Sequence, residues 1–235
     1  LEYEENGAFS LAAQENEFNE LIKVSDLMKN YNIPVEVLDS GQVLKRLGAK
    51  GFEGGILYKN DGAIHPVKLL EKIRKNTKAE LYENQEVKEV QEQGSDRIVV
   101  TKDYRIQCSI VVYCANGYSA ALHPFFEDKI FPTRGQIMVM SPQKKFMEGP
   151  CYANFYLDYF RQLQDGSLLI GGFRQLESDT EKGFSDHTSL KIQKALHDFV
   201  LKHLPEFEKS KVTHRWSGVM GFSVDGEPMI GSLPS

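Results

Sequence analysis

The chain has 235 residues, of which 41% are hydrophobic and 26% are charged, and its formal net charge is −5. These values are ordinary for a globular protein of one large domain or two small ones. Its short clusters of basic residues lie beside acidic ones. The composition therefore excludes the positive surface that nucleic-acid-binding proteins present, and no nucleic-acid partner is expected.

The cysteines, histidines and apolar runs indicate the cellular compartment and whether metal or membrane binding is expected. The three cysteines form no CxxC pair, which is typical of a reducing, cytoplasmic compartment and argues against structural zinc. The six histidines show no HExxH or paired spacing, so no metal is expected. The longest apolar run, residues 110–115, is too short to span a bilayer, so no membrane partner is expected. The acidic first residues do not resemble a signal peptide, and the chain begins with Leu1 rather than Met, which suggests a fragment.

The first sixty residues mix strands and helices. Short strands are predicted at residues 7–12, 35–38 and 52–58. Apolar residues at a helical period predict a helix over residues 15–31, which Asn32 and Pro34 end. Asp39 and Ser40 are predicted to cap a second helix, which Gly48 ends.

The order of the elements predicted for the next segment fits the second half of a dinucleotide-fold sheet. Pro66 is predicted to begin a helix that continues to about residue 75, followed by a short strand at 79–82. Residues 86–93 and 97–102 are predicted to form a hairpin around Gly94. The consecutive apolar residues 110–114 predict a strand buried on both faces of a parallel sheet.

The remainder is rich in strand patterns. Strands are predicted at residues 130–131, 136–140, 154–156, 159–163 and 168–173, with a turn at Asp165-Gly166 between the last two. An amphipathic helix is predicted over residues 190–204. A further strand pattern at residues 211–216 leads into a stretch with glycines at 218, 221, 226 and 231. By spacing alone, this stretch is either a hairpin with generous turns or main chain laid against a flat or charged ligand.

Several short motifs occur in the order found in one enzyme family. Together they resemble the D-amino-acid oxidase/glycine oxidase/sarcosine oxidase family of FAD-dependent oxidoreductases, over essentially the whole chain. The motifs are Asp-Gly-Ala-Ile-His-Pro at 61–66, Val-Val-Tyr-Cys-Ala-Asn-Gly-Tyr at 111–118, Pro-Thr-Arg-Gly-Gln at 132–136, Tyr-Phe-Arg at 159–161, Asp-Gly-Ser-Leu-Leu-Ile-Gly-Gly at 165–172, Trp-Ser-Gly at 216–218 and Ser-x-Asp-Gly-x-Pro-x-Ile-Gly at 223–231.

The resemblance implies a mixed α/β (α+β) fold with a partial FAD-binding lobe and an antiparallel, β-rich substrate lobe. Residues 1–63 and 124–213 would form the substrate lobe, and residues 64–123 and 214–235 the FAD-binding lobe. Members of this family carry a GxGxxG motif near the N-terminus, and this sequence has none. The chain is therefore expected to be a fragment that does not hold FAD firmly by itself.

The resemblance also implies cofactor contacts. Val87 occupies the place where the family backbone meets the adenine end of FAD, and Tyr118 stands where relatives often have Trp. Strand-end packing is the alternative role for these residues. The expected cofactor-binding set is Val87, Ala115, Asn116, Gly117, Tyr118, Gly218 and Gly221.

The expected substrate-binding residues are Arg134, Tyr159, Arg161 and Met220. An arginine can hold a carboxylate through two parallel hydrogen bonds. The family often places such an arginine where this chain has Met220. The substrate is therefore either an amine without that carboxylate, or an amino acid whose carboxylate is held by Arg134 or Arg161.

Other catalytic arrangements are poorly supported. Ser119 and Ser217 lack the G-x-S-x-G elbow of hydrolases, and Asp225 fits a turn better than a catalytic base. Within the family, hydride transfer from a neutral amine to flavin needs no dedicated base, so no catalytic residue is assigned. The function expected is FAD-dependent oxidation of a small amine or amino acid. The alternative is a non-catalytic small-molecule binding module derived from the substrate lobe. The sequence predicts no oligomeric state.

Overall fold

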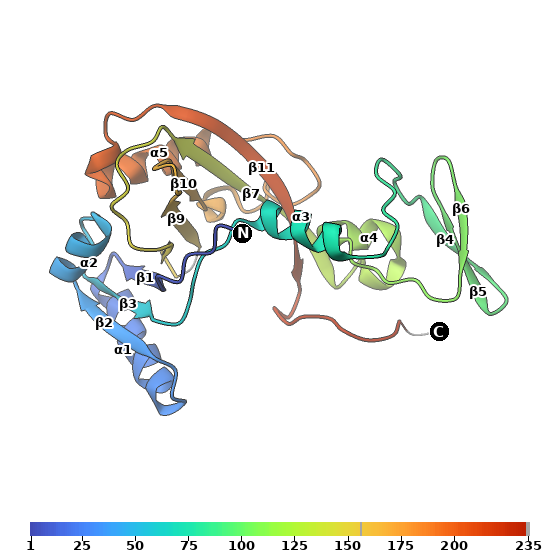
Figure 1. Ribbon diagram of the computed structural model, residues 1–235, viewed down its shortest axis with the longest axis horizontal. Coiled ribbons are helices and arrows are strands. Elements are labelled where there is room, and N and C mark those ends of the chain that lie inside the picture. Colours follow the sequence, from blue (N-terminus) through green and yellow to red (C-terminus); the bar gives the residue numbers. More distant parts are fainter. Residues whose placement is uncertain (156, 234–235) are drawn as a thin grey trace. The chain divides into compact units, whose positions relative to one another are not determined.

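The computed structural model describes residues 1–155 and 157–233 (Figure 1), and the chain divides into two compact units. Unit 1 comprises Leu1–Thr77, Gly135–Ser178 and His187–Ser217. Unit 2 comprises Lys78–Arg134, Asp179–Asp186 and Gly218–Ser235.

Unit 1 begins with the predicted mixture of strands and helices: β1 (Ala8–Ala12), α1 (Glu15–Asn30), β2 (Val35–Asp39), α2 (Ser40–Leu47) and β3 (Gly54–Tyr58). The capping prediction for α2 is confirmed. The Asp39 carboxylate accepts a hydrogen bond from the Gln42 backbone N–H at 2.8 Å, and the Gln42 side chain accepts one from the Asp39 N–H at 2.9 Å. Gly48 ends the helix with φ +62°, which glycine adopts without strain.

An eight-stranded sheet forms the frame, in the order β11-β7-β10-β9-β8-β1-β3-β2. Strand β1 pairs parallel with β8, and the pairs β1–β3, β2–β3, β8–β9, β9–β10 and β7–β10 are antiparallel. The later strands are β7 (Ile130–Met140), β8 (Cys151–Ala153), β9 (Asp158–Gln162), β10 (Leu168–Gly171) and β11 (Val212–Ser223).

Three predictions for these strands need correction. The strands expected at 130–131 and 136–140 are one continuous strand, β7. The strand expected at 154–156 is wrong at its first two positions, because Asn154 and Phe155 form a turn with positive φ, and residue 156 lies outside the described residues. The closing stretch is a single strand, β11, through Gly218 and Gly221, and it turns only at Asp225-Gly226.

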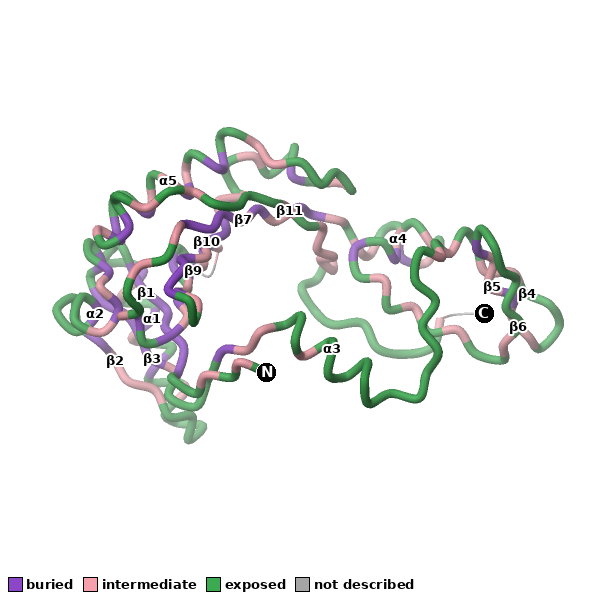
Figure 2. Tube along the Cα trace, turned by 45° about the horizontal axis from the view of Figure 1, so that its top comes forward, coloured by how far each residue is buried: buried purple, intermediate pink, exposed green. Residues whose placement is uncertain are grey.

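One face of the sheet holds the main core. Phe9, Met138, Phe160 and Ile170 are fully buried there, together with Leu196 of helix α5 (Leu190–His203). Figure 2 shows buried stretches along β7, β9 and β10. Because side chains alternate along a strand, Tyr159 and Arg161 project from the face opposite Phe160. On that opposite face, α1 packs only against the far end of the sheet, through Leu21, Ala12 and Ile56. The β9 part of this face is therefore only partly buried.

His203, at the end of α5, is buried between the rings of Phe52 and Phe199, at centroid distances of 4.7 and 4.6 Å. Its Nδ1 lies 2.8 Å from the Lys50 carbonyl oxygen. A carbonyl only accepts, so Nδ1 carries the proton and donates it. Burial lowers the pKa of His203, and the hydrogen bond to Lys50 opposes this only in part.

The free energy of unfolding should depend on His203 ionisation. The unfolded histidine takes up a proton near pH 6.5, whereas the folded one does so at lower pH. Folded stability is therefore lost as the pH falls through about 6.5. Urea unfolding between about pH 7.5 and 5.5 should show wild type losing stability relative to His203→Asn, whose amide can still donate to Lys50. A difference that stays constant across this range would contradict the prediction.

Helix α3 (Pro66–Asn76) forms as predicted, but none of its residues is buried. No described helix combines the length and the apolarity needed to cross a lipid bilayer.

Unit 2 contains a three-stranded antiparallel sheet of β4 (Glu89–Gln93), β5 (Asp96–Val100) and β6 (Arg105–Cys108). The predicted hairpin is confirmed by β4 and β5. The strand expected at 79–82 is absent, and residues 79–82 are irregular.

The buried strand expected at residues 110–114 is also wrong. This run is irregular, and Ile110 and Val112 are 78% and 76% exposed. A strand buried on both faces needs neighbouring strands and covering helices, and no described strand of unit 2 pairs with this run. The apolar pattern is real, but unit 2 does not supply the layers that would bury it.

Candidate functional site

Two segments of unit 2 meet backbone to backbone. Asn116, at φ +51°, begins a short 3₁₀ turn (Asn116–Tyr118), and its side-chain Oδ1 accepts a hydrogen bond from the Gly221 N–H at 2.7 Å. A Cβ atom on Gly117 would lie 2.9 Å from the Val219 side chain, and one on Gly221 would lie 2.7 Å from the Gly117 nitrogen. Only glycine permits this approach, so both glycines are explained first by packing against each other.

The other expected cofactor residues lie in different surroundings. Tyr118 is half-exposed and stacks on Phe184, and Ala115 accepts a hydrogen bond from the Tyr118 N–H at 2.9 Å. Gly218 faces open space, with no atom within 4 Å of where its Cβ would be. Val87 is partly buried in the coil before β4. Met220 lies beside Gly117, with its carbonyl oxygen 3.2 Å from the Cβ that Gly117 lacks. The fold thus brings Asn116, Gly117, Met220 and Gly221 together.

The surface that these residues present is backbone, one aromatic ring and open space, which is the kind of surface that a flat ring system needs. The turn at Asn116-Gly117 presents backbone, Tyr118 presents a half-exposed aromatic ring, and Gly218 leaves space unfilled. Neither residues 115–118 nor 218–221 include an acidic side chain. The pyrophosphate of FAD has no comparable binding site in this sequence, because the 235 residues include no GxGxxG loop.

Arg134 is engaged by the protein itself. Its side chain and that of Glu181 are 3% and 0% exposed, and they form an ion pair in which Nε lies 3.2 Å from both carboxylate oxygens. Nη1 donates to Ser185 Oγ at 3.0 Å, and Nη2 donates to the Thr180 carbonyl at 3.3 Å. This geometry favours a role in holding the segment around Glu181 over a role in binding substrate.

Tyr159 and Arg161 lie on β9 of unit 1, on the face opposite the main core. Tyr159 is paired with Tyr152 on β8 and with Gly171 on β10. A Cβ on Gly171 would lie 2.6 Å from the Tyr159 ring, so this glycine makes room for the ring. Burial raises the pKa of the Tyr159 hydroxyl, which therefore stays neutral and able to donate a hydrogen bond. Arg161 Nη1 lies 3.5 Å from the Ile64 carbonyl, and its side chain is partly exposed.

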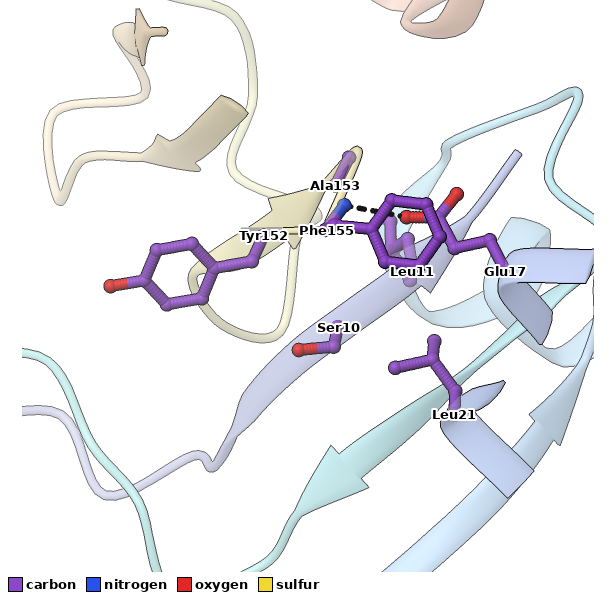
Figure 3. Close-up of a pocket in the computed structure, with 7 residues that line it drawn as sticks. All are labelled: Ser10, Leu11, Glu17, Leu21, Tyr152, Ala153 and Phe155. Atoms are coloured by element: carbon purple, nitrogen blue, oxygen red, sulfur yellow. Dashed lines mark hydrogen bonds between the residues drawn. The ribbon is translucent and has the colours of Figure 1, made fainter. Parts of the chain in front are cut away.

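A small cavity beside Tyr152 is a poor candidate for a substrate site (Figure 3). Its volume is about 10 Å³, which is room for one water molecule at most. Glu17, which lines it, already accepts hydrogen bonds from the N–H groups of Phe155 and Ala13 at 2.8 and 3.0 Å. An open groove of about 490 Å³ between α5 and β11 includes neither Tyr159 nor Arg161.

Sequence reasoning missed Tyr152, Glu181 and Phe184. The strand alternation around Tyr152 gave a usable signal, since Cys151 and Ala153 are buried on either side of it. No local sequence pattern pointed to Glu181, because its partner Arg134 lies 47 residues away along the chain.

Comparison with known proteins identifies the family of the chain. The model of the FAD dependent oxidoreductase family (DAO) matches residues 1–235. The chain is 25% identical over 215 residues to the "probable oxidoreductase OrdL" of Rhizobium meliloti, covering 87% of this chain and 48% of that protein. It is 24% identical to the glycine oxidase of Geobacillus kaustophilus, covering 98% of this chain and 62% of that protein. It thus spans about half to three fifths of the length of these relatives.

Solved structures share the fold. The crystal structure of glycine oxidase from G. kaustophilus superposes with a TM-score of 0.86 at 21% identity, covering 99% of this chain and 63% of that one. L-proline dehydrogenase from P. horikoshii gives a TM-score of 0.84 at 16% identity, covering 99% of this chain and 64% of that one. The expected mixed α/β fold and the expected family are both confirmed. The chain belongs to the family of FAD-dependent oxidoreductases.

Proposed function

We propose that the full-length protein oxidises a small amine or amino acid with FAD as its cofactor. The observation that carries this is the apposition of Asn116-Gly117 with Gly221, because it brings the motif at 111–118 against the closing segment that holds the last two motifs. Relatives support the substrate class: one is a glycine oxidase, and another, 23% identical over 86% of this chain and 48% of its own length, is the gamma-glutamylputrescine oxidoreductase of Escherichia coli.

In this proposal unit 2 provides the cofactor-binding residues. Asn116, Gly117, Tyr118, Gly218 and Gly221 would line the ring system, with Ala115, Val87 and Met220 as further members of the unit 2 set. Bound FAD would accept the hydride that the substrate loses. The chain's own residues would bind and orient the substrate and keep water from it. We assign residues 1–63 and 124–213 to the substrate lobe, and residues 64–123 and 214–235 to the FAD-binding lobe.

Arg161 and Tyr159 are the proposed substrate-binding residues. Arg161 is partly exposed on the open part of the sheet face, and the only hydrogen bond described for its side chain is the long one to Ile64. It is therefore available for a carboxylate, whereas Arg134 is held by Glu181. Tyr159, neutral and anchored between Tyr152 and Gly171, would supply a hydrogen-bond donor and a ring against which an aliphatic substrate packs.

Arg161 should decide between the two substrate types. Arg161→Met should raise KM for an amino acid by about 10-fold or more, since a hydrogen bond between charged groups contributes about 1.5–3 kcal/mol. The same change should leave KM for an amine without a carboxylate nearly unchanged. The assay is steady-state oxidation of a panel of amines and amino acids, followed by peroxide release and, in parallel, by reduction of an artificial dye. Arg161→Lys is the matched control that keeps the charge.

Two results would count against this proposal. A purified full-length protein that is colourless and cannot be reconstituted with FAD would favour the non-catalytic binding module. If Arg161→Met changes KM equally for both substrate types, Arg161 does not hold a carboxylate.

A further inference from the structure

The segment Asp179–Asp186, called the strap below, is held against the first half of β7 within unit 2. The Arg134 N–H donates to the Glu181 carbonyl at 2.7 Å, and the Gly183 N–H donates to the Pro132 carbonyl at 3.0 Å. Lys182 forms an antiparallel bridge with Thr133. The strap therefore lies antiparallel to β7 at an isolated β-bridge and forms no named strand of its own.

The Arg134–Glu181 ion pair joins the strap to β7 by side chains at the same place as these backbone hydrogen bonds. Both side chains are buried, and taking two charges out of water offsets much of their mutual attraction, so the pair is a poor source of stability alone. A slip of one residue would put either Lys182 or Thr180 opposite Arg134, which places two positive charges together or leaves Arg134 without its counter-charge. The pair thus selects one register of the strap.

This register determines where Phe184 lies. Gly183 has φ +115°, a conformation that favours glycine, and it turns the chain immediately before Phe184. The Phe184 ring stacks on the Tyr118 ring with centroids 5.3 Å apart and planes at 24°. The two rings are 46% and 51% exposed. Tyr118 directly follows Asn116-Gly117, so the strap reaches the candidate cofactor surface through a single aromatic contact.

We propose that Phe184 is a positioning residue of the flavin site, and that Arg134 and Glu181 position it through the strap. Phe184 fixes the ring of Tyr118 and, through it, the Asn116–Tyr118 turn. This inference rests on the proposed function. It assigns Arg134 a positioning role through Phe184 in place of direct contact with substrate.

Substitution of Phe184 in the full-length protein tests this inference. Phe184→Ala should weaken FAD binding by about three- to tenfold, the range expected from loss of an aromatic pair. Phe184→Tyr should bind FAD like wild type, because it keeps the ring. Lys182→Ala, an exposed change in the same strap, is the control and should also bind like wild type. FAD affinity is measured by quenching of flavin fluorescence, and Tm is measured on each apoprotein.

Hydrogen–deuterium exchange of the apoprotein gives a readout that is independent of FAD. Phe184→Ala should speed exchange of the amides at 116–118 with little change in Tm, since the Phe184 side chain is half-exposed. If wild type binds FAD and Phe184→Ala binds it equally well, the inference fails while the proposed function stands. If wild type binds no FAD after reconstitution, both fail. Unchanged exchange at 116–118 also overturns the inference.

Discussion

Replacing Arg134 with methionine should lower the free energy of unfolding by about 3–5 kcal/mol, the largest effect expected of any single change at the candidate site. The carboxylate of Glu181 would remain fully buried without its counter-charge. The hydrogen bonds to Ser185 and Thr180 would be lost as well. Urea unfolding of the full-length protein at neutral pH measures the effect.

The double variant Arg134→Met/Glu181→Leu should recover most of this loss, because two apolar side chains can replace a buried ion pair at little cost. The exposed pair of Lys129 with Asp128 offers a control, and Lys129→Met should change unfolding very little. If Arg134→Met is as stable as wild type, the ion pair is not buried in solution as the structure describes. If the double variant is no better than the single one, the loss comes from the shape of the arginine side chain and not from its charge.

The double variant also separates the effect of the ion pair on stability from its effect on the register of the strap. It should fold, but no charge would then select the register of the strap. FAD affinity should therefore stay below that of wild type even where stability is regained. Full recovery of both would mean that the ion pair acts on stability only.

Gly221→Ala and Gly218→Ala should differ sharply, although both lie on β11 and differ from wild type by one methyl group. The Gly221 Cβ would meet the Gly117 nitrogen at 2.7 Å and the Asn116 Oδ1 at 2.9 Å, so the two segments must separate. We expect Gly221→Ala to lower the free energy of unfolding by about 1–3 kcal/mol, as over-packing does in a tight interior. FAD retention should fall with it, because the hydrogen bond from the Gly221 N–H to Asn116 is disturbed.

Gly218→Ala should leave the stability of the apoprotein nearly unchanged, since no atom lies within 4 Å of the added methyl group. Its effect should appear only when FAD is added, because the methyl group would occupy space assigned here to the cofactor. Urea unfolding of the apoproteins and FAD titration of each variant make the comparison. Normal FAD affinity in Gly218→Ala would place the cofactor elsewhere, and unaltered stability in Gly221→Ala would show that the two backbones are not closely apposed.

Features set within a few residues were predictable from the sequence. The capping of α2 by Asp39 and its end at Gly48 depend on chemically specific neighbours, and both were predicted in place. Helices α1 and α5 also form where their apolar period predicts them, although Val24 and Leu27 of α1 are exposed, and a turn forms as predicted at Gly166, where φ is +89°. Helix periods, caps and turn residues act over one or two turns of chain, so their signals are complete in a short window.

Features that depend on distant partners were decided only by the tertiary structure. Residues 110–114 have the composition of a buried strand, but in unit 2 no described strand pairs with them. Arg134 has the chemistry of a carboxylate clamp, but a glutamate 47 residues away engages it. The sequence by itself determined the family, the helices with their caps, and the glycines that let two backbones meet. Burial and ion pairing depend on residues that are distant in the sequence. No local pattern specifies which distant residue will be the partner, so only the tertiary structure decides them.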